Sequence, residues 1–355
     1  MSNKVFKSSL ILVVFLLLVG STFNVFSEAP AYTHNGTKFF PVIFWHNVNP
    51  ATEGAFLNEL KAGGFNVVTV WYNQVTPANL NLLNSKGLKC RNNIHNQLRN
   101  VNPTALAGWV DPIKNHTALF DYLTGDEPCW SYALNPATAT TLAQFTEGKN
   151  QLRLLDPDHD LTLNYADHWQ TIDTSGTCSV ADYQAWRAAG TSYSMDIYPV
   201  TAAYPAGNLN RIGNGCNFLR TKINGSKPFT MILQAYDARS GIYPTKTELR
   251  FMVFTSIING ARGIGWYGYP AQLETNHMHV WNDVKAINNE VKALNNALSY
   301  GVTNTAYTLH TSGLEAISKT YGGYKYLIVA NRTSSTKNNA SITVSGWGSN
   351  VIQEL

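Results

Sequence analysis

Short apolar runs alternate with amphipathic stretches along most of the chain, from about residue 39 to residue 300. The runs are rich in β-branched and aromatic residues, and the stretches between them carry Leu, Ala and charged residues at helical spacing. Eight runs are predicted as strands: residues 41–45, 65–72, 88–94, 118–124, 161–166, 191–198, 229–236 and 263–269. Because a helical pattern follows each run, the sequence predicts repeated strand-helix units and a parallel sheet.

Eight such units in roughly 260 residues is the size of a (β/α)8 TIM barrel. Several predicted helices stop at glycine just before a strand, as in KAGGFNVV and NSKGLKC. The alternative is an open doubly wound sheet. The count of eight, and the lack of a Gly-rich phosphate loop after the first run, favour the barrel.

The two ends of the chain follow other patterns. Residues 1–27 hold Lys4 and Lys7, an apolar run from Leu10 to Val19 and then small polar residues, which is typical of a secretory signal peptide cut near Glu28. An uncleaved anchor is the alternative. Residues 301–355 change to short alternating runs with Gly-Gly and Ser/Thr/Asn turns, which predicts a small antiparallel β module after a barrel of residues 28–300.

Composition adds a hint about the ligand. Aromatic residues make up 12% of the 355 residues, including nine Trp and 18 Tyr, and flat aromatic faces stack on sugar rings. The formal charge of +4 falls to +2 without Lys4 and Lys7, and the basic residues are scattered. A nucleic acid partner is therefore not expected, nor membrane contact after signal cleavage. We expect a secreted monomer without a cofactor.

Four cysteines, Cys90, Cys129, Cys178 and Cys216, form an even set in a chain expected in an oxidising compartment. Two disulfides are expected, and the pairing stays open, as does a buried free pair. Five Asn-x-Ser/Thr sequons follow residue 27, which would be glycosylation acceptors in a eukaryotic host. They lie at Asn35, Asn115, Asn224, Asn331 and Asn339.

The residues that end the predicted strands are polar and aromatic, and parallel barrels bind ligands at these ends. Flat rings mixed with short polar groups suit a polyhydroxylated ligand. Basic residues are rare there, with Arg91 the main exception, which disfavours a phosphorylated substrate. The predicted substrate-binding residues are Trp45, His46, Tyr72, Asn92, His168, Tyr198, Gln234, Tyr236 and Trp266. The two histidines lack metal-ligand spacing and are expected to bind hydroxyls or to pack.

Asp126 and Glu127 directly follow the fourth predicted strand, in LFDYLTGDEPCW. A solvated turn is the ordinary interpretation of such a pair. Here an apolar strand leads straight into the pair and Pro128 stiffens the exit, so we predict that Glu127 is a general acid. Asp126, if ionised, would raise the pKa of Glu127 by like-charge repulsion.

Three motifs, GDEP at 125–128, MDIYP at 195–199 and LRFMVFTSIINGARGIGWYGY at 249–269, resemble the secreted (β/α)8 glycoside hydrolases. In that superfamily a strand-four acid, often within DEP or NEP, is the proton donor, and a trailing β module is common. The resemblance covers the first strand through the last helix. It implies hydrolysis of a polysaccharide or glycan, with Glu127 as proton donor.

The second carboxylate stays open. The large retaining clan carries a glutamate nucleophile at the end of strand seven, where this chain has Gln234. One hypothesis uses Asp196 or Asp237 as nucleophile or base. The other resembles substrate-assisted hexosaminidases, with Asp126 orienting a 2-acetamido group.

In the second hypothesis Tyr198 would steady the acetamido group, and Trp266 would form the floor of the site. Both aromatic residues are equally suited to the barrel core. Asp167 is a reserve candidate. A carbohydrate-binding barrel without catalysis is the alternative function, because the strand-seven glutamate is missing.

Overall fold

The computed structural model describes residues 13–17, 28–99, 102–128, 141–167, 179–202, 208–238, 241–268, 278–304 and 307–345. Eight parallel strands close into a barrel in chain order, with the last beside the first. They are β4 (Val42–Asn47), β5 (Val67–Trp71), β6 (Lys89–Asn93), β7 (Leu119–Asp126), β8 (Asp160–Ala166), β9 (Ser192–Ile197), β10 (Phe229–Gln234) and β11 (Gly263–Tyr267). The predicted (β/α)8 barrel is confirmed.

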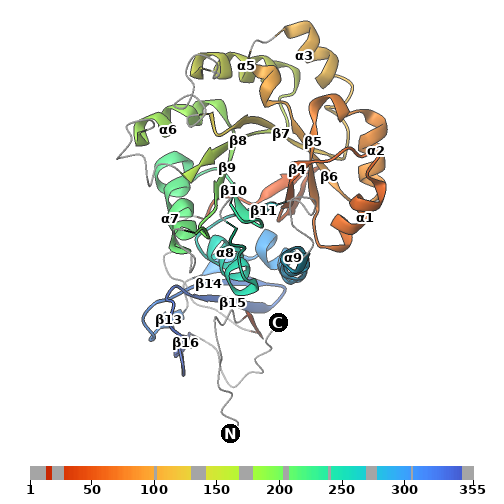
Figure 1. The fold of residues 1–355 in the computed structure, drawn as a ribbon. Helices are drawn as coiled ribbons and strands as arrows, with labels where there is room; N and C mark the ends of the chain where they lie inside the picture. Colours follow the sequence, from red (N-terminus) through yellow and green to blue (C-terminus); the bar gives the residue numbers. More distant parts are fainter. Residues whose placement is uncertain are drawn as a thin grey trace.

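Helices surround the barrel and follow its strands (Figure 1). They are α1 (Gly54–Ala62), α2 (Pro77–Ser85), α3 (Pro103–Val110), α5 (Leu142–Leu155), α6 (Val180–Trp186), α7 (Asn210–Phe218), α8 (Lys246–Ile258) and α9 (Met278–Tyr300). Thr141, Ser179 and Thr245 each begin a helix with a capping box, in which the cap and a side chain three residues later bond each other's backbone N–H groups.

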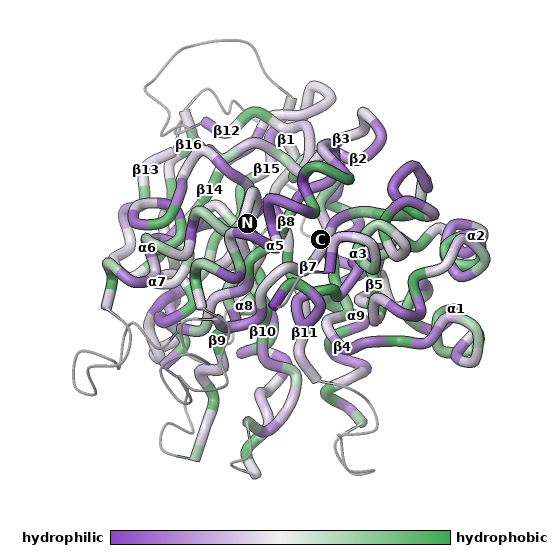
Figure 2. The backbone as a smooth tube through the Cα atoms, turned by 90° about the horizontal axis from the view of Figure 1, so that it is seen from above, coloured by the Kyte–Doolittle hydropathy of each residue, from purple (hydrophilic) through white to green (hydrophobic). Residues whose placement is uncertain are grey.

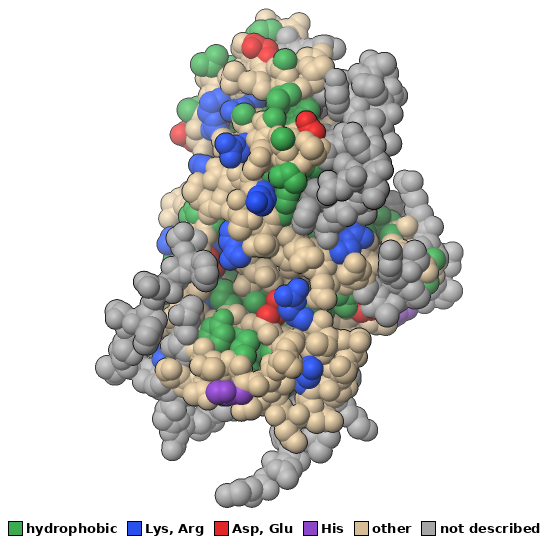
Figure 3. Space-filling view, turned by 90° about the vertical axis from the view of Figure 1, so that its left-hand side faces the viewer, with side chains coloured by type: hydrophobic (Ala, Val, Ile, Leu, Met, Phe, Trp, Pro, Cys, Tyr) green, Lys and Arg blue, Asp and Glu red, His purple; other side chains and the backbone are tan. Residues whose placement is uncertain are grey.

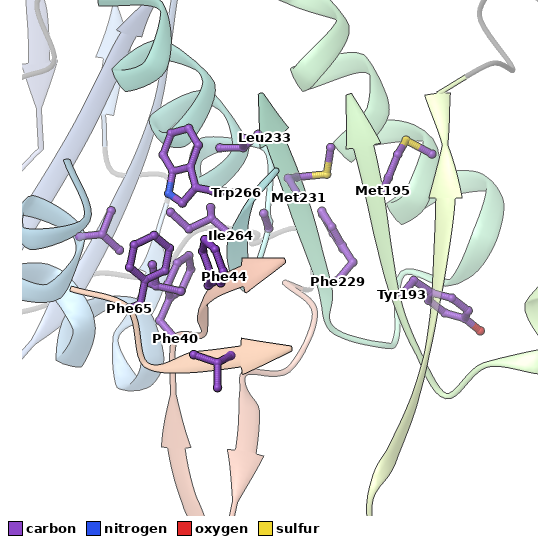
Figure 4. Close-up of a cluster of buried hydrophobic side chains, with 14 of the residues drawn as sticks. Phe40, Phe44, Phe65, Tyr193, Met195, Phe229, Met231, Leu233, Ile264 and Trp266 are labelled. Atoms are coloured by element: carbon purple, nitrogen blue, oxygen red, sulfur yellow. The ribbon is translucent and has the colours of Figure 1, made fainter. Parts of the chain in front are cut away.

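Side chains of each barrel strand alternate between the helix layer and the barrel interior. On β9, Tyr193, Met195 and Ile197 join the main hydrophobic core, whereas Ser192 and Asp196 occupy the alternate positions, which face the interior. Figure 4 shows Tyr193 and Met195 together with outward residues of β10 and β11. This alternation decides which residues at the strand ends can meet a ligand.

A hairpin of β2 (Tyr32–His34) and β3 (Thr37–Phe39) lies at one end of the barrel (Figure 2). Its turn, Asn35-Gly36, has positive φ at both residues, as a tight two-residue hairpin requires. Tyr32 is fully buried, its hydroxyl is 3.0 Å from Thr230 Oγ1, and its ring lies edge-on to Phe120. The hairpin therefore packs into the N-terminal end of the barrel.

A buried ion pair lies inside the barrel. Arg91 Nε donates to Asp121 Oδ1 at 2.9 Å, and both side chains are fully buried. Thr162 Oγ1 donates to Asp121 Oδ2 at 2.7 Å, and the Arg91 guanidinium lies 5.4 Å from the centre of the Trp45 ring. Arg91 is thus a structural cation of the barrel interior.

The C-terminal residues form antiparallel sheets, as predicted. In one sheet β12 (Val302–Asn304), β14 (Leu314–Tyr321) and β15 (Tyr324–Asn331) pair in turn, and β13 (Tyr307–Leu309) pairs with β16 (Ile342–Val344) in another. Ile317, Tyr326 and Ile328 join the main core, so this module packs on the barrel beside α8 and α9 (Figure 1).

The expected signal segment contains a described strand. β1 (Val13–Leu17) pairs antiparallel with β15 in the uncleaved chain, and cleavage of residues 1–27 stays a prediction. Glu28, the first residue expected after cleavage, accepts hydrogen bonds from Lys319 at 2.8 and 2.9 Å and pairs with Arg262. In the described parts of the chain no helix is both long and apolar enough to cross a membrane.

Cys90 and Cys216 are both free and fully buried, so the expectation of two disulfides is wrong. Cys90 faces the helix layer from β6, and Cys216 lies on α7, where each packs as a small apolar side chain. Burial raises the pKa of both thiols well above the ordinary value. Cys129 and Cys178 lie outside the described residues.

Charged side chains are scattered on the face drawn in Figure 3. Basic residues on this face stand among polar and apolar ones and do not merge into one continuous basic patch. This distribution matches the scattered Lys and Arg of the sequence.

The buried ion pair generates a stability prediction. Replacing Asp121 with Ala leaves the Arg91 guanidinium buried without its counter-charge, so Asp121→Ala should lower the free energy of unfolding by about 3–5 kcal/mol. Asp111→Ala is the matched control, because Asp111 forms an exposed pair with Lys114, and its loss should cost about 0–1 kcal/mol. Equal losses in urea unfolding would contradict this account.

Candidate functional site

Glu127 follows the end of β7 in a strained backbone conformation. Its φ is +44°, which a residue with a long side chain adopts at a cost of about 1–3 kcal/mol, and such strain clusters at functional sites. The backbone N–H of Glu127 donates to Asn164 O on β8 at 3.0 Å. At Gly125 a Cβ would lie 2.4 Å from Leu163 Cδ1, so a larger residue here would displace the Leu163 side chain.

The carboxyl group of Glu127 forms a hydrogen bond with the carboxyl group of Asp196 from β9. Asp196 is only 7% exposed. Burial and the neighbouring Glu127 raise the pKa of Asp196 well above its ordinary value, and burial with the Asp126 charge raises the pKa of Glu127. Two carboxyl groups can hydrogen-bond to each other only while one of them is protonated, so the pair retains one proton where isolated carboxyl groups would be ionised.

Asn164 joins Asp126 to this pair. Its amide nitrogen donates to Asp126 Oδ1 at 2.9 Å and to Asp196 Oδ1 at 3.1 Å, while Ser194 Oγ donates to its Oδ1 at 2.8 Å. The carboxyl oxygens accept, so they select the amide nitrogen of Asn164 over its oxygen and set which way the amide points. Asp126, Glu127 and Asp196 are therefore held together at the C-terminal end of β7, β8 and β9.

An aromatic wall stands beside the carboxyl groups. Tyr267 of β11 lies 5.6 Å from Tyr198 and 5.0 Å from Tyr236, centre to centre, and stacks on His46 at 4.5 Å. Tyr198 also donates a hydrogen bond to Asp196. Gly268 N donates to His46 Nε2 at 3.2 Å, and burial lowers the pKa of His46 to about 4. His46 is therefore neutral above that pH.

The opposite side of the site comes from β4, β5 and β6. Asn93 Nδ2 donates to Asn47 Oδ1 at 3.2 Å, and Asn93 Oδ1 lies 2.6 Å from His95 Nδ1. Burial lowers the pKa of His95, although the Asp126 charge opposes that effect. Trp71 is 37% exposed, and its ring lies 6.2 Å from His95. An exposed indole at a strand end is a ready surface for a sugar ring.

Two predicted binding residues face away from this site. Tyr72 packs edge-on against Trp109 of α3 at 4.8 Å and contacts the main core. Asn92 is fully buried and shares the outer face of β6 with Cys90. Neither side chain is available to a ligand at the strand ends, which corrects both expectations.

The expectation for Trp266 is wrong for the same reason, because this side chain also faces away from the site. Its side chain is fully buried in the outer core, beside Phe44 and Ile264 (Figure 4). The indole N–H donates to Asn288 Oδ1 of α9 at 2.7 Å. Trp266 therefore anchors α9 to the barrel and does not form the floor of the site.

Each of these three corrected residues, Tyr72, Asn92 and Trp266, has a neighbour in the sequence that faces the barrel interior. Trp71, Asn93 and Tyr267 occupy the alternate positions of the same strands, and all three belong to the site. Their identity was visible in the sequence, but the prediction missed them because a shift of one residue changes the face of a strand.

Gln234 faces the barrel interior, but its side-chain amide is hydrogen-bonded to backbone groups. Its Nε2 donates to Val200 O at 2.7 Å and to Tyr236 O at 2.9 Å, and its Oε1 accepts from Val200 N at 2.9 Å. These bonds fix the backbone after β9 and correct the expectation that Gln234 binds substrate. Trp45 points inward but lies against Arg91, 8% exposed. His168 lies outside the described residues.

The two reserve carboxylates have structural partners. Asp167, just after β8, pairs with Arg211 of α7, a cation at the edge of the site that the sequence interpretation missed. Burial raises the pKa of Asp167, and Arg211 opposes that rise. Asp237 accepts a hydrogen bond from Gly241 N at 3.0 Å within its own loop. Within the described residues no group of three or more His, Cys, Asp or Glu side chains is arranged to hold a metal ion.

No family model matches the chain, and no curated protein matches it. Among solved structures it is similar to a β-galactosidase from Rahnella sp. R3, with 11% identity over 79% of this chain and 59% of that chain, at a TM-score of 0.54. A β-galactosidase from Marinomonas ef1 has 11% identity over 72% of this chain and 60% of that chain, at a TM-score of 0.50. A GH2 β-galacturonidase from Eisenbergiella tayi has 13% identity over 72% of this chain and 52% of that chain, at a TM-score of 0.49.

The chain thus spans between about half and three fifths of the length of these three structures. At these identities the likeness concerns the fold, a distant similarity to the barrels of glycoside hydrolases.

The shared proton generates a pH prediction. Above about pH 4 both carboxylates are ionised in the unfolded chain, whereas the folded pair keeps one proton. The folded pair then binds more protons than the same two groups in the unfolded chain, so its contribution to the free energy of unfolding should fall as pH rises, by up to about 1.4 kcal/mol per pH unit. In Asp196→Asn the amide donates to Glu127 without a titrating proton, so this contribution should disappear from the difference between variant and parent.

Urea unfolding between about pH 5 and pH 8 measures the effect. Asp158→Asn is the control, because Asp158 is an exposed aspartate remote from the pair, and its stability curve should run parallel to that of the parent. If Asp196→Asn also ran parallel to the parent, the two carboxyl groups would not share a proton.

Proposed function

We propose that the chain is a secreted glycoside hydrolase that cleaves O-glycosidic bonds in a polysaccharide or glycan, with Glu127 as general acid/base. The observation that carries this proposal is the hydrogen-bonded carboxyl pair of Glu127 and Asp196 at the C-terminal end of the barrel, with Glu127 held at positive φ. A raised pKa extends the pH range in which a carboxyl group stays protonated, and proton donation to a leaving oxygen requires the protonated form.

The surroundings of the pair support a sugar ligand. Tyr198, Tyr236 and Tyr267 offer aromatic surface on one side and Trp71 on the other, while Asn47 and Asn93 offer groups for hydroxyls. The two β-galactosidases that share the fold are named as glycosidases, which is consistent with this reaction class.

The contacts assign different roles to the two aspartates in this proposal. Asp196 is buried beneath Glu127 and bonded to it, so it acts as the partner that holds the proton. A direct bond leaves no room between them for the attacking water that an inverting pair, about 6.5–9.5 Å apart, accommodates. Asp126 is partly exposed and oriented by Asn164, so it is the carboxylate that faces the substrate.

The reaction then proceeds by one proton cycle. Glu127 gives its proton to the glycosidic oxygen as the bond to the anomeric carbon breaks, and the negative charge left on the pair and on Asp126 stabilises the oxocarbenium-like transition state. Glu127 next accepts a proton from the water that attacks the anomeric carbon. Asp126 serves either as the second carboxylate or as the group that orients a 2-acetamido substituent.

A second candidate function is carbohydrate binding without catalysis. It is favoured by one observation, that the strand-seven position of the retaining glutamate holds Gln234 with its amide bonded to backbone. In that case the aromatic wall would bind the glycan, and the carboxyl pair would only join β7 to β9.

Activity of the parent on a panel of polysaccharides and aryl glycosides, compared with Glu127→Gln, tests the proposal. The glutamine cannot donate a carboxyl proton, so hydrolysis should fall by about 10²–10⁴-fold, while binding in affinity electrophoresis is retained. Proton NMR of the first anomer released reports retention or inversion.

Glu147→Gln is the matched control, because Glu147 is exposed on α5, the helix that follows β7, and its activity should be unchanged. Hydrolysis by Glu127→Gln at the parental rate would show that Glu127 is not the acid. A parent that binds glycans of the panel but hydrolyses none would favour the binding barrel.

A further inference from the structure

A cavity of about 320 Å³ opens at the N-terminal end of the barrel. Phe39 and Phe40 before β4, Lys89 at the start of β6 and Asn295 of α9 contribute to its lining. The candidate active site uses the other ends of the same strands. The cavity therefore has no part in the proposed hydrolysis.

Three lysines line this cavity: Lys61 of α1, Lys89 of β6 and Lys292 of α9. No acidic residue is among the described residues that line it. None of the three lysines has a carboxylate within ion-pair distance in the described parts of the chain, whereas Lys285 and Lys319 each do. The cavity is thus an uncompensated cluster of positive charge.

Contacts position two of the three ammonium groups, those of Lys61 and Lys89. Lys61 Nζ donates to Gly87 O at 2.7 Å, and Gly87 has a φ of +66°, a conformation that favours glycine. Lys89 Nζ lies 5.7 Å from the centre of the Phe39 ring and has no hydrogen-bond acceptor among the described residues. Asn295 Oδ1 accepts from Phe40 N at 3.1 Å, which leaves its amide nitrogen as a donor.

Keeping these cations together costs free energy. Burial lowers the pKa of Lys61 and Lys89, and repulsion from Lys292 and from Lys61, respectively, lowers each further. An anion in the cavity would remove this cost. The apolar walls and the volume, near the lower end for ligand sites, suit a small group and not an extended polyanion.

We infer that this cavity binds a small tetrahedral oxyanion, a sulfate or phosphate group, between Lys61, Lys89 and Lys292. The amide nitrogen of Asn295 supplies a further donor to it. Such a group can arrive as the free ion or as the ester of a sugar, and both present the same oxygens to the ammonium groups.

Isothermal titration calorimetry of the full chain tests the site, with sodium sulfate, sodium phosphate and glucose 6-sulfate at constant ionic strength set with chloride. The parent should bind at least one of the three saturably with a stoichiometry of one. Stronger binding of glucose 6-sulfate than of inorganic sulfate would identify a sugar ester as the ligand, and the reverse would identify the free ion.

Two variants separate the site from general salt effects. Lys89→Gln should weaken binding at least tenfold while remaining as stable as the parent in anion-free buffer, because it removes an unpaired cation. Asn295→Asp preserves the acceptor for Phe40 N and places a negative charge beside the lysines, so it should abolish binding. Lys38→Gln, an exposed lysine on β3 outside the cavity, should bind like the parent.

Binding that does not saturate, or binding of equal strength in the parent, Lys89→Gln and Asn295→Asp, would overturn the inference. Neither result depends on hydrolysis, so the site and the proposed enzyme activity stand or fall separately.

Discussion

The alternation of side chains in a closed barrel is the constraint on which the rest of this structure depends. Each strand sends one set of residues into the helix layer and the other into the interior, and the interior set at the C-terminal end meets at one place. Asp126, Asp196 and Tyr267 come from three strands and lie together because each occupies the inward phase. A shift of one residue would replace the site by core side chains.

The same constraint explains what the sequence could and could not predict. All eight strands were predictable, because apolar runs bounded by helical patterns are a strong signal. Glu127, Asp126 and Asp196 were predictable as polar residues where such runs end. The prediction that substrate is bound by Tyr72, Asn92 and Trp266 was wrong. A strand end carries several suitable residues, and only the register of the strand tells which of them faces inward.

Other features required contacts that no local pattern contains. Gln234 is inward, but its amide is used by the backbone at Val200. Arg211 reaches the site from a helix 44 residues after its partner Asp167. The buried cysteines Cys90 and Cys216 lie on a strand and on a helix, respectively. The even number of cysteines in the sequence carried no information about the distance between any two of them.

The two ends of the barrel differ in charge. Carboxyl groups that share a proton lie at the C-terminal end, and unpaired lysines line a cavity at the N-terminal end, with the Arg91–Asp121 pair buried in the interior between these ends. Each end concentrates charge of one sign that the protein itself does not neutralise. Such sites are costly unless a proton or a ligand compensates them, which is the physical basis for assigning function to both.

Glu127 and Asp196 hold one proton between them at a pH where isolated carboxyl groups are ionised. Carbon-13 NMR of the labelled side-chain carboxyl groups, followed from acid to alkaline pH, measures this directly. We expect the two carboxyl signals to titrate together in two steps, with the second step above the ordinary range of about 4. Independent titration of Glu127 and Asp196 near about 4 would contradict the account.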